Sequence, residues 1–489
     1  MSQAAFLAKN TAIQAGGKIL STVIGILVVG IMTRTLGQEG FGLYSTANAY
    51  FQIAAIIIDL GLNVMIVQLL AEQAGNVKEE ERIASGIFTL RTVTAFASFT
   101  ISAIIGLFLP YPTELKAALF AIWGSFFFTA LSQIVIGIHQ RHGTMLSVAG
   151  GEVLGRLVVL AGIAGAVWAG WGLVPMVLIV SLGNVTHFAV AGTALRRTVD
   201  LRWTWDLALW KRILARSWPI GASVVFNLLY YKADTLVLSF VRPFEEVGLY
   251  GAAYRVLDIL ITLPFMYCGV MLPLLSRTVA KKDTEGAARL IRQSFIAMAA
   301  VVAPMVAGGT LLSSRIMDVV AGPEFAAAGP VLDILLLATA FIFLSAVSSY
   351  AIVALDLQKK MLGNYALIAF SALALYILLI PRYGMFAAAG LTVVSEAAVL
   401  VLTARLVTRA LERRPIFPWA GFAKIAAAAG IMALVAAPLR NAWLPLPILA
   451  GAITYGALLF AFGLITKEFA VGMLRLRGTT PASGDDPLP

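Results

Sequence analysis

Apolar residues are grouped along this chain in long blocks, and short polar segments separate one block from the next. Most blocks are long enough for a helix to cross the hydrocarbon core of a bilayer, which takes about 20 residues. Helices are required there because lipid offers no hydrogen-bond partner to unpaired peptide groups. The pattern predicts an all-α polytopic membrane protein with about 14 transmembrane helices. The expected spans are Ile13–Thr33, Leu43–Leu70, Gly86–Leu109, Ala117–Ile138, Leu146–Ala169, Leu173–Leu195, Pro219–Phe240, Gly248–Leu275, Ile291–Ser313, Val331–Leu355, Met361–Ile380, Gly384–Thr408, Trp419–Leu439 and Leu446–Ile465.

A short repeat suggests that the chain has two similar halves. The tripeptide Gly-Leu-Tyr opens the second span at Gly42 and the eighth span at Gly248. Duplicated helix bundles are the architecture that many secondary transporters use for alternating access. We therefore expect two six-helix lobes around a central cavity, followed by two further helices. The expected division is an N-terminal lobe at 1–200, a linker at 201–217, a C-terminal lobe at 218–410, helices 13 and 14 at 411–466, and a cytoplasmic, partly disordered tail at 467–489.

The linker at 201–217 has a pattern of its own. Its tryptophans are interspersed with Lys and Arg, and Leu207, Trp210 and Leu214 fall on one face of a helix. A helix that is apolar on one face and basic on the other lies in the plane of a membrane interface. We expect an interfacial amphipathic helix that joins the two lobes.

Charge sets the expected orientation. With both termini in the cytoplasm, most of the 36 Lys and Arg residues fall in cytoplasmic segments, as positive residues do in membrane proteins. The net charge of +11 then meets the anionic inner leaflet of the plasma (inner) membrane, and no nucleic-acid partner is expected. The outward-facing exceptions are Arg34, Lys116, Arg242, Arg315, Arg382 and Arg440.

The sequence lacks the residues that several chemical functions would need. The chain has one cysteine, Cys268, so it has no intramolecular disulfide framework, and it has no phosphate-binding glycine loop. His139 and His142 have no cysteine cluster or nearby carboxylate to complete a metal site. The longest outward segment, 314–329, is short. We expect no metal, no cofactor and no enzyme activity.

Several stretches resemble the polysaccharide-biosynthesis oligosaccharide flippases. These belong to the superfamily that also contains lipid II flippases and multidrug and toxin extrusion antiporters. The resemblance runs from the first to the twelfth span, and it implies fourteen helices in two six-helix lobes around a central cavity. Its motifs are Thr33–Tyr44, Asp59–Leu62, Tyr230–Asp234, Val247–Arg255, Pro323–Phe325, Ile380–Gly384 and Ser395–Glu396.

Basic residues inside the spans are the candidate binding groups. An ionisable residue at the centre of a membrane helix costs about 2.5–3.5 kcal/mol, so each calls for a reason. The pyrophosphate of a lipid-linked oligosaccharide would need cations in the low-dielectric core, and the planar fork of arginine matches phosphate oxygens well. The candidates for binding the substrate are Lys18, Arg34, Arg156, Lys232 and Arg255.

Structural roles remain open for some of these cations. Arg156 lies one turn from Glu152, and Arg255 lies one turn from Asp258, so each pair could simply hold helices together. Arg34 could cap the carbonyls at the end of the first span and reach the interface.

Carboxylates inside the spans are candidates for coupling transport to H+ or Na+. Desolvation favours the protonated form of a buried carboxyl, so such a group can carry a proton. The candidates are Asp59, Asp234, Asp258 and Glu396. Alternatively, each could hydrogen-bond a neighbouring helix.

The favoured function is that of a monomeric flippase for surface polysaccharide export. It would move a polyprenyl-pyrophosphate-linked oligosaccharide across the plasma membrane by alternating access. An ion-coupled multidrug antiporter of the same superfamily is the alternative, and its cationic substrates would favour a cavity richer in unpaired carboxylates. A membrane polysaccharide polymerase or ligase would need a larger outward loop than this chain has.

Overall fold

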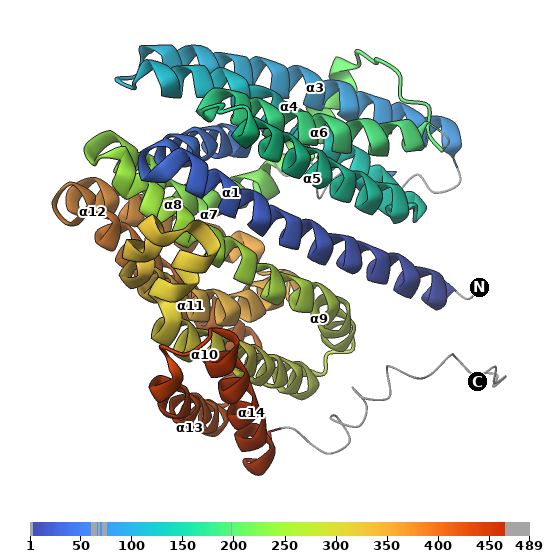
Figure 1. The fold of residues 1–489 in the computed structure, drawn as a ribbon. Helices are drawn as coiled ribbons and strands as arrows, with labels where there is room; N and C mark the ends of the chain where they lie inside the picture. The colour runs from blue at the N-terminus through green and yellow to red at the C-terminus, as the bar shows by residue number, and fades with distance from the viewer. Residues whose placement is uncertain (1–2, 60–65, 67–68, 71–75, 197, 465–489) are drawn as a thin grey trace.

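The protein is described by a computed structural model, and its described residues form helices and no strand (Figure 1). The predicted all-α class is confirmed. The structure describes residues 3–59, 66, 69–70, 76–196 and 198–464, with the backbone alone described at 3–15, 56–59, 216 and 218–231.

The helices follow one another with short connections. In chain order they are α1 (Gln3–Asp59), α3 (Val77–Phe108), α4 (Thr113–His142), α5 (Met145–Trp168), α6 (Leu173–Leu195), α7 (Leu207–Val241), α8 (Phe244–Leu260), α9 (Thr262–Ala280), α10 (Thr284–Ala321), the 3-10 helix η1 (Pro323–Ala328), α11 (Gly329–Ala354), α12 (Gln358–Ala410), α13 (Trp419–Ala436), the 3-10 helix η2 (Ala437–Leu439) and α14 (Pro445–Ala461).

Among the described residues, 10 helical segments are long and apolar enough to cross a membrane. This number and the apolar composition identify a multi-pass membrane protein. The expected total of fourteen spans stays a prediction.

Two glycines break long helices where the sequence predicted a boundary between spans. Gly37 interrupts α1 with φ 66° and ψ −173°, between the first two expected spans. Gly384 interrupts α12 with φ 57° and ψ −138°, at the first residue of the expected twelfth span. Side chains other than glycine are strained in this region of φ and ψ. Each glycine therefore lets the chain turn between two membrane helices.

One expected span is divided. The sequence predicted a single helix over Gly248–Leu275, but α8 ends at Leu260 and α9 begins at Thr262. Pro264 accounts for the break, because its ring clashes with the carbonyl four residues earlier, at Leu260, and it has no N–H to donate.

The expected linker boundary at 217/218 does not coincide with a helix end. Residues 199–206 are not helical, and α7 then continues from Leu207 to Val241. Asp206 caps its start by accepting a 2.9 Å hydrogen bond from the Leu209 N–H. Trp210 is buried and donates a 3.0 Å bond to the Gly86 carbonyl of α3. Trp210 therefore packs against α3, whereas Leu207 on the same predicted face is exposed. That this segment is a linker in the membrane interface stays a prediction.

The helices pack in two groups joined by α1 (Figure 1). In the first group, α6 packs against α4 and α5, and α3 packs against α4. In the second, α11 packs against α10 and α12, and α7 packs against α12. The long α1 contacts α4 and α5 on one side and α7 and α8 on the other, while α13 and α14 pack beside α10. That these groups form separate lobes with the expected boundaries stays a prediction.

The two glycines of the Gly-Leu-Tyr repeat meet where α1 crosses α8. A Cβ on Gly42 would collide with the Phe244 carbonyl oxygen, and a Cβ on Gly248 would collide with the Gln38 carbonyl oxygen. Each carbonyl lies four residues before the opposite glycine, so the contact is nearly symmetric. The missing side chains are what let the two backbones touch.

We expect Gly248→Ala to lower the apparent midpoint of thermal unfolding of the purified protein. Overpacking a close contact costs about 1–3 kcal/mol, which exceeds the gain of about 1 kcal/mol from alanine in a helix. Gly165→Ala on α5 is the matched control, because nothing lies within 4 Å of its Cβ position. Equal midpoints for the two variants would contradict the close crossing.

Candidate functional site

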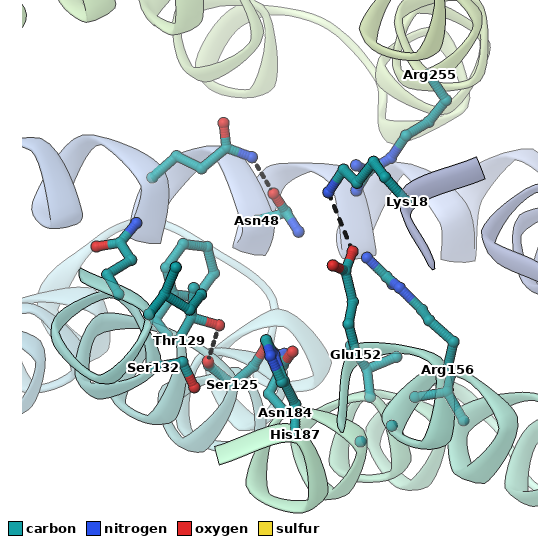
Figure 2. A pocket seen from close by; sticks show the side chains of 18 of the residues that line it. Lys18, Asn48, Ser125, Thr129, Ser132, Glu152, Arg156, Asn184, His187 and Arg255 are labelled. Carbon is teal, nitrogen blue, oxygen red and sulfur yellow. Dashed lines mark hydrogen bonds and ion pairs between the residues drawn. The ribbon is translucent and has the colours of Figure 1, made fainter. Parts of the chain in front are cut away.

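A charged cavity lies where α1 meets α5 and α8 (Figure 2). Its main part has a volume of about 370 Å³, and two neighbouring parts have about 200 and 30 Å³. Lys18 and Arg156 line both of the larger parts, and Arg255 lines all three. We refer to these connected spaces as the central cavity.

One wall of the central cavity is polar and uncharged. It is formed by α4 and α6, which present Thr129, Ser132 and Asn184 toward the space. The Asn184 amide donates a 2.6 Å hydrogen bond to Ser125 Oγ, and this bond holds the two helices together. These hydroxyl and amide groups can exchange hydrogen bonds with water or with a hydroxyl-rich ligand.

Lys18 and Glu152, which both line the central cavity, form an ion pair between α1 and α5. Lys18 Nζ lies 3.1 Å from Glu152 Oε1, which also accepts a 2.8 Å bond from Ser21 Oγ. Figure 2 shows Lys18 between Arg255 and Glu152. Glu152 thus pairs with α1, and the expected pairing with Arg156 on its own helix is not the contact that the structure has.

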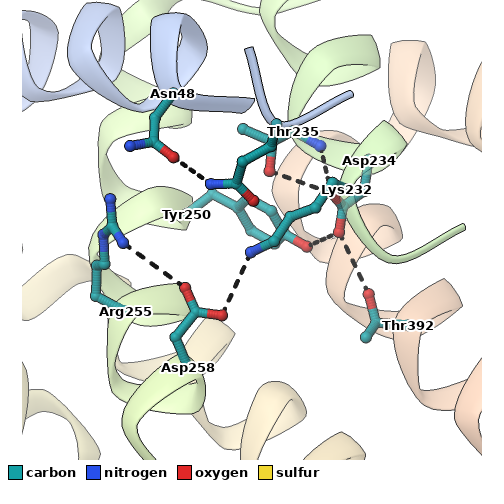
Figure 3. A network of polar contacts seen from close by, with 9 residues as sticks. Asn48, Lys232, Asp234, Thr235, Tyr250, Arg255, Asp258 and Thr392 are labelled. Atoms are coloured by element: carbon teal, nitrogen blue, oxygen red, sulfur yellow. Dashed lines mark hydrogen bonds and ion pairs between the residues drawn. The ribbon is translucent and has the colours of Figure 1, made fainter. Parts of the chain in front are cut away.

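A single carboxylate stands between two cations on the opposite side of the cavity (Figure 3). Asp258 Oδ1 lies 3.3 Å from Lys232 Nζ, and Oδ2 lies 3.9 Å from Arg255 Nη1. Lys232 also lies over the Tyr254 ring at 4.3 Å, and Arg255 lies 5.9 Å from the Tyr44 ring centroid. Aromatic faces of this kind stabilise cations.

The described lining of the central cavity has more cations than carboxylates. Its cations are Lys18, Arg156, Lys232 and Arg255, and its carboxylates are Glu152 and Asp258. Four positive groups against two negative groups leave an excess of two positive charges. A space of this charge, walled by apolar helices, favours an anion.

Asp234 is fully buried behind the cavity, between α7, α8 and α12 (Figure 3). Its carboxylate accepts hydrogen bonds from Tyr250 Oη at 2.5 Å, from the Thr235 N–H at 2.5 Å and from Thr235 Oγ1 at 3.1 Å, with Thr392 Oγ1 at 3.5 Å. Donors from three helices therefore surround one carboxylate, which makes it a joint of the second helix group.

The structure brings together most of the predicted site residues. Lys18, Arg156, Lys232, Arg255 and Asp258 line the central cavity, although they come from four different helices.

The other candidates lie elsewhere. Arg34 donates to the carbonyls of Asp318 at 3.1 Å and Val319 at 2.7 Å, at the end of α10, so its contacts are those of a cap on a neighbouring helix. Glu396 is buried in α12, with Ser345 Oγ at 3.5 Å. The side chain of Asp59 lies outside the described residues.

Sequence reasoning overlooked the neutral residues of the cavity. Tyr44, Asn48 and Gln52 all line it from the second part of α1. They are spaced four residues apart, so they share one helix face, and that spacing within a predicted span is the signal that would have identified them.

Comparisons with known proteins find similarity to a polysaccharide biosynthesis family and to a protein named as a flippase. A family model described as Polysaccharide biosynthesis protein matches residues 7–279. A protein of Haloferax volcanii named Probable flippase AglR is 22% identical over 485 residues, covering 94% of this chain and 97% of that protein.

Solved structures share the fold at low sequence identity. The lipid II flippase MurJ in an inward closed conformation has a TM-score of 0.77 and 16% identity, over 93% of this chain and 100% of the MurJ chain. An inward-facing multidrug resistance MATE family transporter has a TM-score of 0.66 and 13% identity, over 83% of this chain and 100% of its own. The fold is therefore the one shared by MurJ and MATE transporters.

We expect Tyr250→Phe to lower the apparent midpoint of thermal unfolding. The substitution keeps the ring but leaves the buried Asp234 carboxylate without one of its donors, which costs about 1–3 kcal/mol. Tyr383→Phe, at an exposed tyrosine of α12, should leave the midpoint unchanged. A Tyr250→Phe protein as stable as wild type would show that this hydrogen bond contributes nothing to the fold.

Proposed function

The chain belongs to the polysaccharide biosynthesis protein family, and from this membership and its charged cavity we propose that it flips a polyprenyl-pyrophosphate-linked oligosaccharide across the plasma membrane. The protein would bind the substrate at the cytoplasmic face and release it at the outer face, for export of a surface polysaccharide. The similarity to a protein named as a flippase supports this class of activity.

The observation that carries the proposal is the excess of two positive charges in the central cavity. A pyrophosphate that links a lipid to a sugar carries one negative charge on each phosphate. Moving such a group through hydrocarbon without cations is prohibitive, whereas paired and hydrogen-bonded charges can be buried. The cavity charge therefore matches this head group in sign and in size.

Each part of the cavity has a role in the proposed binding. Arg255 and Lys232 bind the phosphate oxygens, with Arg255 offering its planar fork. Lys18 and Arg156 bind the second phosphate. The polar wall of α4 and α6 exchanges hydrogen bonds with the sugar hydroxyls.

Alternating access supplies the movement. The two helix groups, with the expected boundaries 1–200 and 218–410, rock about the cavity that lies between them. The crossing at Gly42 and Gly248 closes one side of the cavity and separates when the other side closes. The chain works as a monomer, with both termini in the cytoplasm.

Coupling to H+ or Na+ would use the carboxylates inside the spans. Asp258 faces the cavity cations, whereas Asp234 and Glu396 are buried in the second helix group. Asp59 is the candidate in α1. Protonation or ion binding at one of them would change the charge of that group and bias the orientation of the two helix groups.

A multidrug antiporter is the alternative, favoured by the fold shared with a MATE transporter. Its cationic substrates would meet repulsion from the four cations of the central cavity. This charge distribution favours an anionic substrate. Transport is also favoured over a polymerase or ligase reaction, because the longest outward segment expected from the sequence, 314–329, is short.

We expect Lys232→Ala and Arg255→Ala to abolish most surface polysaccharide while the protein still inserts. At an effective dielectric near 20, a close charge pair is worth about 4 kcal/mol before desolvation is subtracted, and a quarter of that is about fivefold in occupancy. Arg255→Lys should give less polysaccharide than wild type, because lysine lacks the planar fork.

Polysaccharide is measured on cells expressing each variant at the native level, with membrane abundance as a second readout. Arg202→Ala is the matched control, because this arginine is exposed and pairs with an exposed carboxylate, Asp200. Normal polysaccharide from both cavity variants would disprove the cationic site.

Cysteine labelling tests the orientation. We expect Lys281→Cys to be protected from an impermeant thiol reagent in intact cells, and Ala327→Cys to be labelled, in a Cys268→Ala background. Lys281 and Ala327 are exposed, Lys281 just before the start of α10 and Ala327 in η1 after its end, whereas Cys268 is buried. Labelling of position 281 from outside would contradict the predicted orientation.

A further inference from the structure

A second hollow also lies against α4 and α6, and it is lined by other residues of these helices than the central cavity. Its volume is about 760 Å³. Along α4, Thr129 and Ser132 line the central cavity while Phe128 and Val135 line this hollow. The two spaces therefore lie against different faces of the same two helices, and we call the second one the lateral groove.

Aromatic rings line the lateral groove. Phe88 of α3 stacks in parallel on Phe188 of α6, with ring centroids 6.5 Å apart, and Phe128 of α4 lies 5.6 Å from Phe188. The two walls, α3 and α6, are candidate membrane spans. Ala189 and Thr193 are exposed at the edge of the groove, so its mouth opens at the surface of the protein.

The segment 199–206 closes one end of the groove. It runs along α3, where Ser85 Oγ accepts a 3.1 Å bond from the Arg202 N–H and Thr89 Oγ1 accepts a 3.1 Å bond from the Thr204 N–H. Beyond the groove the segment is fixed again, because Arg82 donates to the Asp206 carboxylate at 2.5 Å. The Leu209 N–H and this arginine hold the pKa of Asp206 below its usual range.

Polar and amphipathic residues stand at this closed end. Arg196 and Trp203 line it, and the Trp203 side chain is 64% exposed. Tryptophan is enriched at the level of lipid head groups, and arginine there meets phosphate. Of the carboxylates near this end, Asp200 pairs with Arg202 at 2.8 Å and Glu81 accepts a 3.5 Å hydrogen bond from the Asp200 N–H, so both are engaged away from Arg196.

We propose that the lateral groove binds an anionic phospholipid of the membrane. One acyl chain lies against Phe88, Phe128 and Phe188, and the head-group phosphate contacts Arg196. The groove volume is within the range of about 300–1,000 Å³ typical of small-molecule pockets, which is room for one acyl chain and not for the whole lipid. An aromatic groove between two candidate membrane spans, with a cation at one end, matches the apolar chain and the charged head group of a phospholipid. This site is independent of the proposed function.

The bound lipid has a structural consequence. The segment 199–206 connects α6 to α7, and so connects the two helix groups. A lipid beneath it holds this connection against α3. Anionic phospholipid should therefore raise the apparent midpoint of thermal unfolding of the purified protein.

Gly192→Leu tests the groove by filling it. A Cβ at position 192 meets only the Phe188 ring, at 4.0 Å, so the backbone accepts the change and the leucine side chain takes the place of the lipid chain. Gly165→Leu is the matched control, because nothing lies within 4 Å of its Cβ position. Binding of phosphatidylglycerol to detergent-purified protein is measured by native mass spectrometry.

We expect wild type and Gly165→Leu to bind phosphatidylglycerol equally, and Gly192→Leu to bind about tenfold more weakly, because the leucine side chain occupies space that the acyl chain would take. Arg196→Gln should still bind phospholipid but lose the preference for phosphatidylglycerol over phosphatidylcholine.

Three results would overturn the proposal. These are equal binding by Gly192→Leu and wild type, an unchanged lipid preference in Arg196→Gln, and a groove that takes polyprenyl phosphate in place of phosphatidylglycerol. If Gly192→Leu fails to fold, quenching by brominated phosphatidylglycerol replaces it, measured as the difference between wild type and Trp203→Phe. No difference in quenching would also overturn the proposal.

Discussion

The contact between α1 and α8 at Gly42 and Gly248 is the constraint on which the rest of the arrangement depends. Two backbones can touch there because neither glycine has a side chain, and the near symmetry of the contact follows from the repeated tripeptide. This contact brings α8 to α1 and so places Arg255 beside Tyr44, whose ring it faces. The central cavity owes its position to a close packing of two small residues some distance from its charges.

The charges of the cavity and the packing of the helices are linked by shared residues. Lys232 lies in α7 two residues before Asp234, which is held by Tyr250 of α8 and by Thr235 of its own helix. The buried network therefore fixes the helix from which the cavity cation projects. A rigid joint behind a charged surface is what a protein needs if two helix groups are to move as units and keep their binding groups aligned.

The fold was largely predictable because lipid leaves few choices. The lengths of the apolar blocks predicted the helices, and Gly37 and Gly384 interrupt α1 and α12 where boundaries were expected. The break at Ile261 and the continuity of α7 were missed, because the first depends on one proline and the second on burial of Trp210 against α3. The partners of the charged side chains were harder to predict than the helices. Glu152 pairs with Lys18, which is far away in sequence, and no local spacing reveals that pairing.

The Asp258 carboxylate competes with any anionic ligand for the cavity cations Lys232 and Arg255. It already occupies the position between Lys232 and Arg255 that an anionic ligand would take. Because it is part of the chain, its effective concentration is fixed and high, whatever the composition of the solution. A small anion with a single charge, such as chloride, would rarely displace it, whereas a ligand with two linked phosphates can contact several of the cavity cations at once. Under the proposed function, this carboxylate keeps abundant small anions out and returns to its place when the true ligand leaves.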